Sequence, residues 1–136
     1  MSDATIVTNR DFTRLQDLVQ AWSAGHSAPL AQFLEGVLDR AVIVPSERVN
    51  PDVVTMNTRL TFRDDDSGVV RSVTVVYPGE EDSALGRISV LTPVGSALVG
   101  LSAGQSTEWR TLDGRRKRLT VLSILQQPEA EGRFED

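Results

Sequence analysis

Two runs of carboxylates and one run of bases are the residues of this 136-residue sequence whose types and spacing could do chemistry. The acidic runs are Asp64 to Asp66 and Glu80 to Asp82, and the basic run is Arg115 to Arg118. Clustered carboxylates can bind a hard cation, and clustered bases can contact phosphate or an acidic partner. The first run lacks the alternating ligands and distal glutamate of a calcium loop, so both acidic runs are predicted to be solvated turns. At a predicted hairpin tip, the basic run is interpreted as a solvated turn that protects an edge strand.

His26 is the sole histidine, and the sequence offers it no evident catalytic partner. A general base needs a second group within hydrogen-bond reach, and neighbouring Gly25 and Ser27 supply no charge relay. The sequence contains no cysteine, no P-loop, no Rossmann glycine pattern and no HExxH motif. We therefore predict no catalytic residue, no cofactor and no metal site, and expect a binding protein and not an enzyme.

Composition restricts the partners and the compartment. A formal net charge of −5 argues against non-specific nucleic-acid binding, which needs a strongly basic face. The first residues, MSDATIVTNRDF, lack the basic and apolar regions of a signal peptide. No apolar run approaches the ~18 residues of a membrane span. A cytoplasmic monomer is expected.

Two amphipathic helices are predicted in residues 1–46. Residues 1–9 are expected to form an extended lead-in, and Thr8 to Asp11 to cap the first helix, with Asp11 replacing the usual Glu of a capping box. The second helix is expected to run from about Pro29 until Pro45 ends it. The apolar stripes are Phe12, Leu15, Leu18, Val19 and Trp22 in the first helix, and Leu30, Phe33, Leu34, Val37, Leu38 and Ala41 in the second. The short connection Ala24 to Ala28 predicts an antiparallel hairpin.

The seam of this hairpin should bury Phe33 and Leu38, which lie on the more regular stripe. Trp22 continues the first stripe and is predicted to lie in the seam as well. The alternative for Trp22 is an exposed anchor for a partner protein.

Residues 44–51 are interpreted as a linker, after which the apolar period changes from 3.6 to 2. Met56, Leu60 and Phe62 should face the core of a half-buried strand, while Arg59, Thr61 and Arg63 face outward. Later strands are expected in the segments Val69–Tyr77, Ile88–Leu91, Thr107–Leu112 and Lys117–Leu125. Asp113-Gly114 predicts a hairpin turn, and Leu119, Val121 and Leu125 should share the inner face of the last strand.

A short helix is predicted between the segments Ile88–Leu91 and Thr107–Leu112. Thr92 offers an N-cap oxygen, Pro93 suits the first helical position, and Gly100 suits a left-handed helix end. Val94, Leu98 and Leu101 follow the spacing of one helical face. The fold class is therefore α+β, with a helical hairpin followed by a mainly antiparallel sheet and one short helix.

The stretch ISVLTPVGSALVG also resembles the strand–Ser/Thr-Pro–helix signature in the C-terminal domain of bacterial Gre transcript-cleavage factors. The segments Asp52 to Thr58 and Gln127 to Ala130 make the resemblance more specific within the Gre-related proteins. With its short N-terminal half, the whole chain resembles the Rnk family, the regulators of nucleoside diphosphate kinase. This resemblance implies a shortened coiled-coil hairpin in residues 1–46, an FKBP-like Gre-type domain in residues 52–128 and a polar tail in residues 129–136.

The resemblance implies a partner, RNA polymerase, and a place on it, the rim of the secondary channel. Docking in Gre factors is assigned to the Ser/Thr-Pro turn, which maps onto Thr92, Pro93 and Val94. The acidic residue that precedes this turn in some Gre factors is replaced by Leu91. The expected function is competition with Gre-type factors, and the family name implies an effect on nucleoside diphosphate kinase that could be indirect.

Cleavage chemistry is not expected to carry over. In Gre factors, paired acidic residues at the coiled-coil tip help to hold a second Mg²⁺ in the polymerase active site. Here the tip, Ala24 to Ala28, has no carboxylate, and the nearest acids are Asp17 and Glu35. Helices of about 13 residues also reach only ~20 Å.

Two other functions remain open from the sequence. One is an FKBP-like prolyl isomerase, whose pocket needs aromatic walls that only Phe62, Tyr77, Trp109 and Phe134 could supply. The other is a generic protein-binding adaptor that does not act on RNA polymerase.

Overall fold

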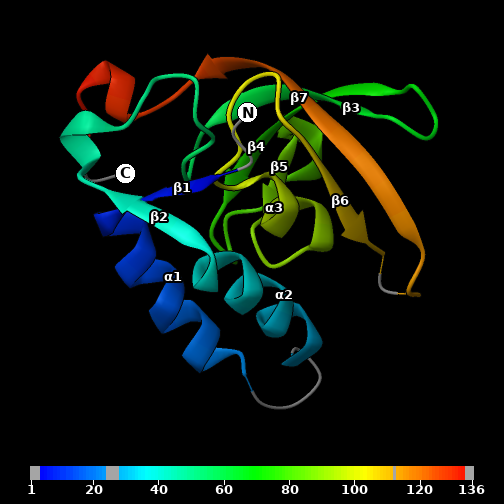
Figure 1. Cartoon of the computed structure of the whole chain (residues 1–136), viewed down its shortest axis with the longest axis horizontal. Coiled ribbons are helices and arrows are strands. Elements are labelled where there is room, and N and C mark those ends of the chain that lie inside the picture. The colour runs from blue at the N-terminus through cyan, green and yellow to red at the C-terminus, as the bar shows by residue number, and fades with distance from the viewer. Residues whose placement is uncertain (1–3, 24–27, 112, 134–136) are drawn as a thin grey trace.

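The computed structural model describes residues 4–23, 28–111 and 113–133. Helices α1 and α2 lie together below a small two-stranded ribbon, and a curled five-stranded sheet surrounds the short helix α3 (Figure 1). In chain order the elements are β1 (Thr5–Thr8), α1 (Asn9–Ala21), α2 (Ala28–Asp39), β2 (Ala41–Val44), η2 (Ser46–Arg48), β3 (Arg59–Asp64), β4 (Val70–Val76), η3 (Ser83–Leu85), β5 (Arg87–Ser89), α3 (Pro93–Leu98), β6 (Ser106–Arg110), β7 (Arg116–Gln126) and η4 (Glu129–Glu131).

The predicted pair of N-terminal helices is confirmed, and its first helix begins at the predicted cap. The Thr8 hydroxyl accepts a hydrogen bond from the backbone N–H of Asp11 at 3.1 Å. Leu15 and Val19 of α1 are buried, as are Leu34 and Leu38 of α2. The two helices therefore bury the apolar stripes that predicted them.

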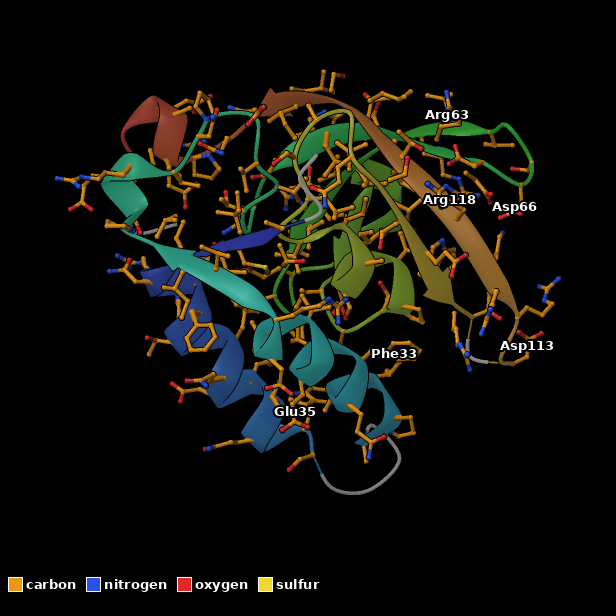
Figure 2. All side chains as sticks on the ribbon, in the orientation of Figure 1. Phe33, Glu35, Arg63, Asp66, Asp113 and Arg118 are labelled. Atoms are coloured by element: carbon orange, nitrogen blue, oxygen red, sulfur yellow. The ribbon has the colours of Figure 1, made fainter. Side chains whose placement is uncertain are left out.

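Two residues assigned to the helical seam lie elsewhere. Trp22 follows α1 and is 38% exposed, so its predicted place in the seam is wrong. Phe33 is only half-buried and projects from the side of α2 that faces away from α1 (Figure 2). The stripe of α2 is wide enough to face both α1 and the rest of the protein, and Phe33 lies at its margin.

The extended lead-in and the predicted end of the second helix contain strands that were not predicted. α2 ends at Asp39, and β2 occupies residues 41–44, so the predicted continuation of the helix until Pro45 is wrong. β1 and β2 pair in parallel, from Thr5 opposite Ala41 to Thr8 opposite Val44. A parallel pair needs a crossover connection, which α1 and α2 provide. β1 also joins this ribbon to the second half of the chain, because the N–H of Ile6 donates to the carbonyl of Gly100 at 2.9 Å.

The sheet has the strand order β5-β4-β3-β7-β6 and is mixed. Three neighbouring pairs are antiparallel as predicted, but β5 runs parallel to β4. The long loop containing η3 brings the chain back to Thr74, so β5 runs beside the last three residues of β4 in the same direction. Leu60, Phe62, Val75, Leu119 and Val121 line the inner face. They share one continuous core with α3 and the N-terminal helices.

The last strand differs from its prediction at one end. Leu119 and Val121 are buried, but Leu125 is 52% exposed. The pairing of β7 with β3 shifts register twice, between Arg59 and Leu60 and again between Thr61 and Phe62. The shift between Phe62 and Thr61 inserts Leu122 and reverses the alternation of faces, so Ile124 pairs with Leu60. The shift between Leu60 and Arg59 leaves Leu125 as the inserted residue, without a partner on β3.

Candidate functional site

The turn that enters α3 is held by hydrogen bonds from both sides of Thr92. Its hydroxyl donates to the carbonyl of Ser89 at 2.7 Å and accepts from the N–H of Gly95 at 3.0 Å. Pro93 occupies the first helical turn. The predicted cap is confirmed, and Thr92 uses its hydroxyl as donor and as acceptor to fix the turn.

Close packing beneath the turn adds to this rigidity. A Cβ on Gly95 would lie well inside contact distance of the Ser89 carbonyl oxygen and 2.9 Å from the Cα of Val90. The Ser96 hydroxyl, itself buried, donates to the carbonyl of Val90 at 2.6 Å. α3 is therefore seated directly on the backbone that leaves β5, and the predicted left-handed residue, Gly100 with φ 90°, follows it.

Thr92, Pro93 and Val94 are each half-buried, so each presents part of its surface to solvent. None of them carries a titratable group. Their shared surface offers shape and apolar contact instead of acid–base chemistry, which suits recognition of another protein.

The Asp64–Asp66 run and the Arg115–Arg118 run are brought together by the structure. Lys117 Nζ lies 2.8 Å from Asp64 Oδ2, and Asp66 Oδ2 accepts from the backbone N–H of Arg118 at 2.9 Å. Arg63, Asp66 and Arg118 gather where the β3–β4 turn approaches β7 (Figure 2). These carboxylates are engaged with their own basic neighbours, and in the described part of the chain no group of His, Cys, Asp and Glu could hold a metal ion.

Ionisation of the first acidic run follows from these contacts. The Lys117 hydrogen bond lowers the pKa of Asp64, and hydrogen bonds from Thr120 and Arg63 lower the pKa of Asp65. The Arg63–Asp65 pair is 2.7 Å apart but solvent-exposed on the arginine side. Exposed pairs of this kind contribute little to stability, so the cluster mainly fixes the geometry of the turn.

A buried carboxylate, Asp11, joins the N-terminal half of the chain to its second half. Its Oδ2 accepts from the backbone N–H of Met56 at 3.1 Å, and the residue is 3% exposed. Burial raises the pKa of Asp11, although the Met56 N–H, Thr8, Arg14 and Arg10 oppose that effect. Asp11 was predicted only as part of a capping box with Thr8, and its contact with Met56 could not be foreseen because it joins segments 45 residues apart.

The two segments that narrowed the family resemblance contact each other. Gln127 Nε2 donates to the carbonyls of Asn50 at 2.9 Å and Val53 at 2.8 Å. The Thr55 hydroxyl donates to Glu129 Oε1 at 2.7 Å and also contacts the Thr58 hydroxyl. These hydrogen bonds hold the segment before β3 against the segment after β7.

The aromatic residues available to an isomerase pocket do not line one cavity. Phe62 is buried in the core. Tyr77 lines a polar groove and lies beneath the guanidinium of Arg14, whereas Trp109 lines a separate small hollow and contacts Lys117. Phe134 lies outside the described residues.

Most of the predicted hairpin tip, residues 24–27 with His26, lies outside the described residues. The nearest acids, Asp17 on α1 and Glu35 on α2, are exposed. α1 has 13 residues and α2 has 12, so each helix is about 20 Å long or shorter. None of the helices in the described ranges has the length and apolar character needed to cross a bilayer.

Two family models match this chain, one in each half. A family model described as "Transcription elongation factor, GreA/GreB, C-term" matches residues 49–126, and one described as "Rnk N-terminus" matches residues 4–44. Over 134 residues, the chain is 39% identical to the "Regulator of nucleoside diphosphate kinase" of Escherichia coli (strain K12), with 98% of each chain covered. Over 83 residues it is 34% identical to "Transcription elongation factor GreA" of Azorhizobium caulinodans, covering 61% of this chain but 53% of that protein.

A solved structure extends the similarity to the fold. "Prokaryotic transcription elongation factor GreA/GreB from Nitrosomonas europaea" superposes with a TM-score of 0.70 at 34% identity. The match covers 92% of this chain and 100% of that one. The arrangement of helices, sheet and α3 is thus shared with this structure as a whole.

Proposed function

We propose a function from the family to which this chain, with its Rnk N-terminus and GreA/GreB C-terminal domain, belongs: that of the regulator of nucleoside diphosphate kinase. The proposed function is binding to bacterial RNA polymerase at the rim of the secondary channel. Bound there, the chain competes with Gre-type elongation factors and does not itself cleave RNA. Any effect on nucleoside diphosphate kinase then follows from altered transcription.

The observation that carries this proposal is the half-exposed turn of Thr92, Pro93 and Val94. It lies at the Ser/Thr-Pro position of the Gre signature, and its hydrogen bonds hold it in one conformation. A turn that is rigid before binding loses little conformational entropy on docking. Thr92, Pro93 and Val94 are accordingly proposed as docking residues.

The absence of cleavage is supported by the N-terminal helices. In the Gre mechanism, acids at a long tip must reach the polymerase active site, and the short α1 and α2 are not suited to that reach. The tip sequence, Ala24 to Ala28, supplies no carboxylate for Mg²⁺.

The test is a pull-down of core RNA polymerase by the full chain, with variants chosen from the geometry of the turn. Thr92→Asp is unsuitable because a carboxylate cannot donate to the Ser89 carbonyl that Thr92 contacts at 2.7 Å. Pro93→Glu is suitable, since an acidic residue is favourable in the first turn of a helix, and it places a charge on the proposed contact.

Gln16→Glu is the matched control, because it adds the same negative charge at an exposed position of α1, outside the proposed docking turn. Wild type and Gln16→Glu should retain the polymerase, and Pro93→Glu should lose it while melting like wild type. Retention by a folded Pro93→Glu variant would place docking elsewhere. Failure of wild type to retain the polymerase would favour an adaptor for another protein.

A further inference from the structure

Four polar residues form a continuous row across the outer face of the sheet. In the strand register, Arg59 of β3 pairs with Gln126 of β7 on one side and with Thr74 of β4 on the other. Thr74 pairs in turn with Arg87 of β5. Paired residues on neighbouring strands point to the same face, and strands lie about 4.8 Å apart. Arg59 and Arg87 therefore stand about 10 Å apart at their Cα atoms, with the Thr74 hydroxyl between them.

The row forms the floor of an open groove of about 810 Å³. Its walls include Tyr77 and the Glu80–Asp82 loop, and Arg14 of α1 and Arg133 after η4 also line it. The volume falls in the range of about 300–1,000 Å³ found for small-molecule sites. The lining is mainly polar, which suits a charged ligand better than an apolar one.

The two guanidinium groups of the row have no partner among the described residues. Across the part of the chain that the structure describes, neither Arg59 nor Arg87 makes an ion pair or a side-chain hydrogen bond, and both side chains are exposed. Two of the three carboxylates in the acidic loop are engaged by its own backbone, because Glu81 accepts from the N–H of Gly79 and Asp82 from the N–H of Ala84. Two unpaired guanidinium groups thus flank a hydroxyl in a protein of net charge −5.

We propose that Arg59, Thr74 and Arg87 bind the phosphate groups of a small phosphorylated molecule. A guanidinium presents several N–H donors in a planar fork that matches phosphate oxygens. A diphosphate group has enough oxygens to accept from both forks and from the hydroxyl between them, whereas one carboxylate can satisfy only one fork fully. The site is separate from the α3 turn, so it can exist whether or not the chain docks on RNA polymerase.

The experiment is calorimetric titration of the full chain with pyrophosphate, and with inorganic phosphate, at constant ionic strength set by chloride. Wild type should bind pyrophosphate more tightly than phosphate. Arg59→Gln and Arg87→Gln should each weaken pyrophosphate binding by roughly tenfold, the loss expected for a charge-assisted hydrogen bond. Thr74→Val, which keeps the shape of the side chain, should weaken it by a smaller factor.

The matched control is Arg71→Gln. Arg71 is exposed on β4, pairs with Phe62 and does not line the groove. The Arg71→Gln variant should bind pyrophosphate like wild type, and thermal melts should show that all four variants fold. Equal weakening in Arg71→Gln, or none in Arg59→Gln and Arg87→Gln, would overturn the site. Binding of a hexaglutamate peptide in the absence of pyrophosphate binding would overturn it in favour of a contact with an acidic protein segment.

Discussion

Gly95→Ala should destabilise the protein even though alanine is the better helix former. Gly95 lies in the first turn of α3, and an added Cβ would meet three backbone atoms: the Ser89 carbonyl oxygen, the Ser89 carbonyl carbon at 3.0 Å and the Val90 Cα at 2.9 Å. Backbone atoms cannot rotate away as a side chain can. α3 must therefore move off β5, or the turn before it must deform.

The expected magnitude follows from opposing effects. Overpacking a buried site costs about 1–3 kcal/mol, and alanine regains up to about 1 kcal/mol of helix propensity. Displacing α3 also stretches the bonds that Thr92 makes to the Ser89 carbonyl, at 2.7 Å from its hydroxyl and 3.1 Å from its N–H. Each such bond contributes about 1 kcal/mol. We expect a net loss of about 2 kcal/mol.

Gly36→Ala is the matched control, because Gly36 is also helical but has space around it. Its nearest neighbour to a new Cβ is Arg40 Nη1 at 3.9 Å, the end of a flexible side chain. This substitution should stabilise the protein by about 0.4–1 kcal/mol. Urea unfolding followed by circular dichroism measures both variants. If Gly95→Ala is as stable as Gly36→Ala, α3 is not seated on the β5 backbone and the rigidity of the docking turn is refuted.

Three further predictions concern the N-terminal half. Leu38→Ala should cost about 2–5 kcal/mol, whereas Phe33→Ala, which truncates a half-buried side chain, should cost about 1 kcal/mol or less, and equal urea midpoints would contradict this. Burial raises the pKa of Asp11 above its ordinary 3.8, so the folded state keeps a proton that the unfolded chain releases. Wild type should therefore lose stability relative to Asp11→Asn as the pH rises from 3.8 to the raised pKa of the folded state. Unfolding measured at several pH values would show no such trend if Asp11 were solvated. In stalled elongation complexes the protein should not stimulate RNA cleavage, and stimulation that is lost in Asp17→Asn or Glu35→Gln would contradict the proposed absence of cleavage.

Local patterns were sufficient to predict the helices and the turn before α3. The Thr8 and Thr92 caps each depend on a few adjacent residues, and the burial of Leu15 and Leu38 depends on helical period alone. The position of Gly100 likewise follows from the need for a residue that tolerates positive φ. Such features are fixed within one or two turns of chain.

Features that depend on pairing between distant segments could not be predicted in the same way. β1 and β2 have only four residues each, and Ala41 fitted the preceding helical stripe equally well. The exposure of Leu125 follows from two register shifts against β3, which leave no mark in the pattern of β7 itself.

The candidate sites show the same limit. The sequence placed Arg59 on an outer face, but its neighbours Thr74 and Arg87 come from other strands whose register was unknown. The contact between Lys117 and Asp64 joins residues more than fifty positions apart. From the sequence alone, the acidic and basic runs were therefore two separate motifs, and their contact depends on the pairing of β3 with β7.

The central proposal, docking on RNA polymerase through the α3 turn, is tested most directly by competition with a Gre factor. A labelled Gre factor is bound to core RNA polymerase, and its release by increasing amounts of this chain is followed by fluorescence anisotropy. Wild type and the exposed control Gln16→Glu should displace the Gre factor with equal midpoints. Pro93→Glu should need at least about tenfold more protein, the effect of about 1.4 kcal/mol of lost contact. Displacement by folded Pro93→Glu at the wild-type midpoint, or no displacement by wild type at saturating concentration, would contradict the account.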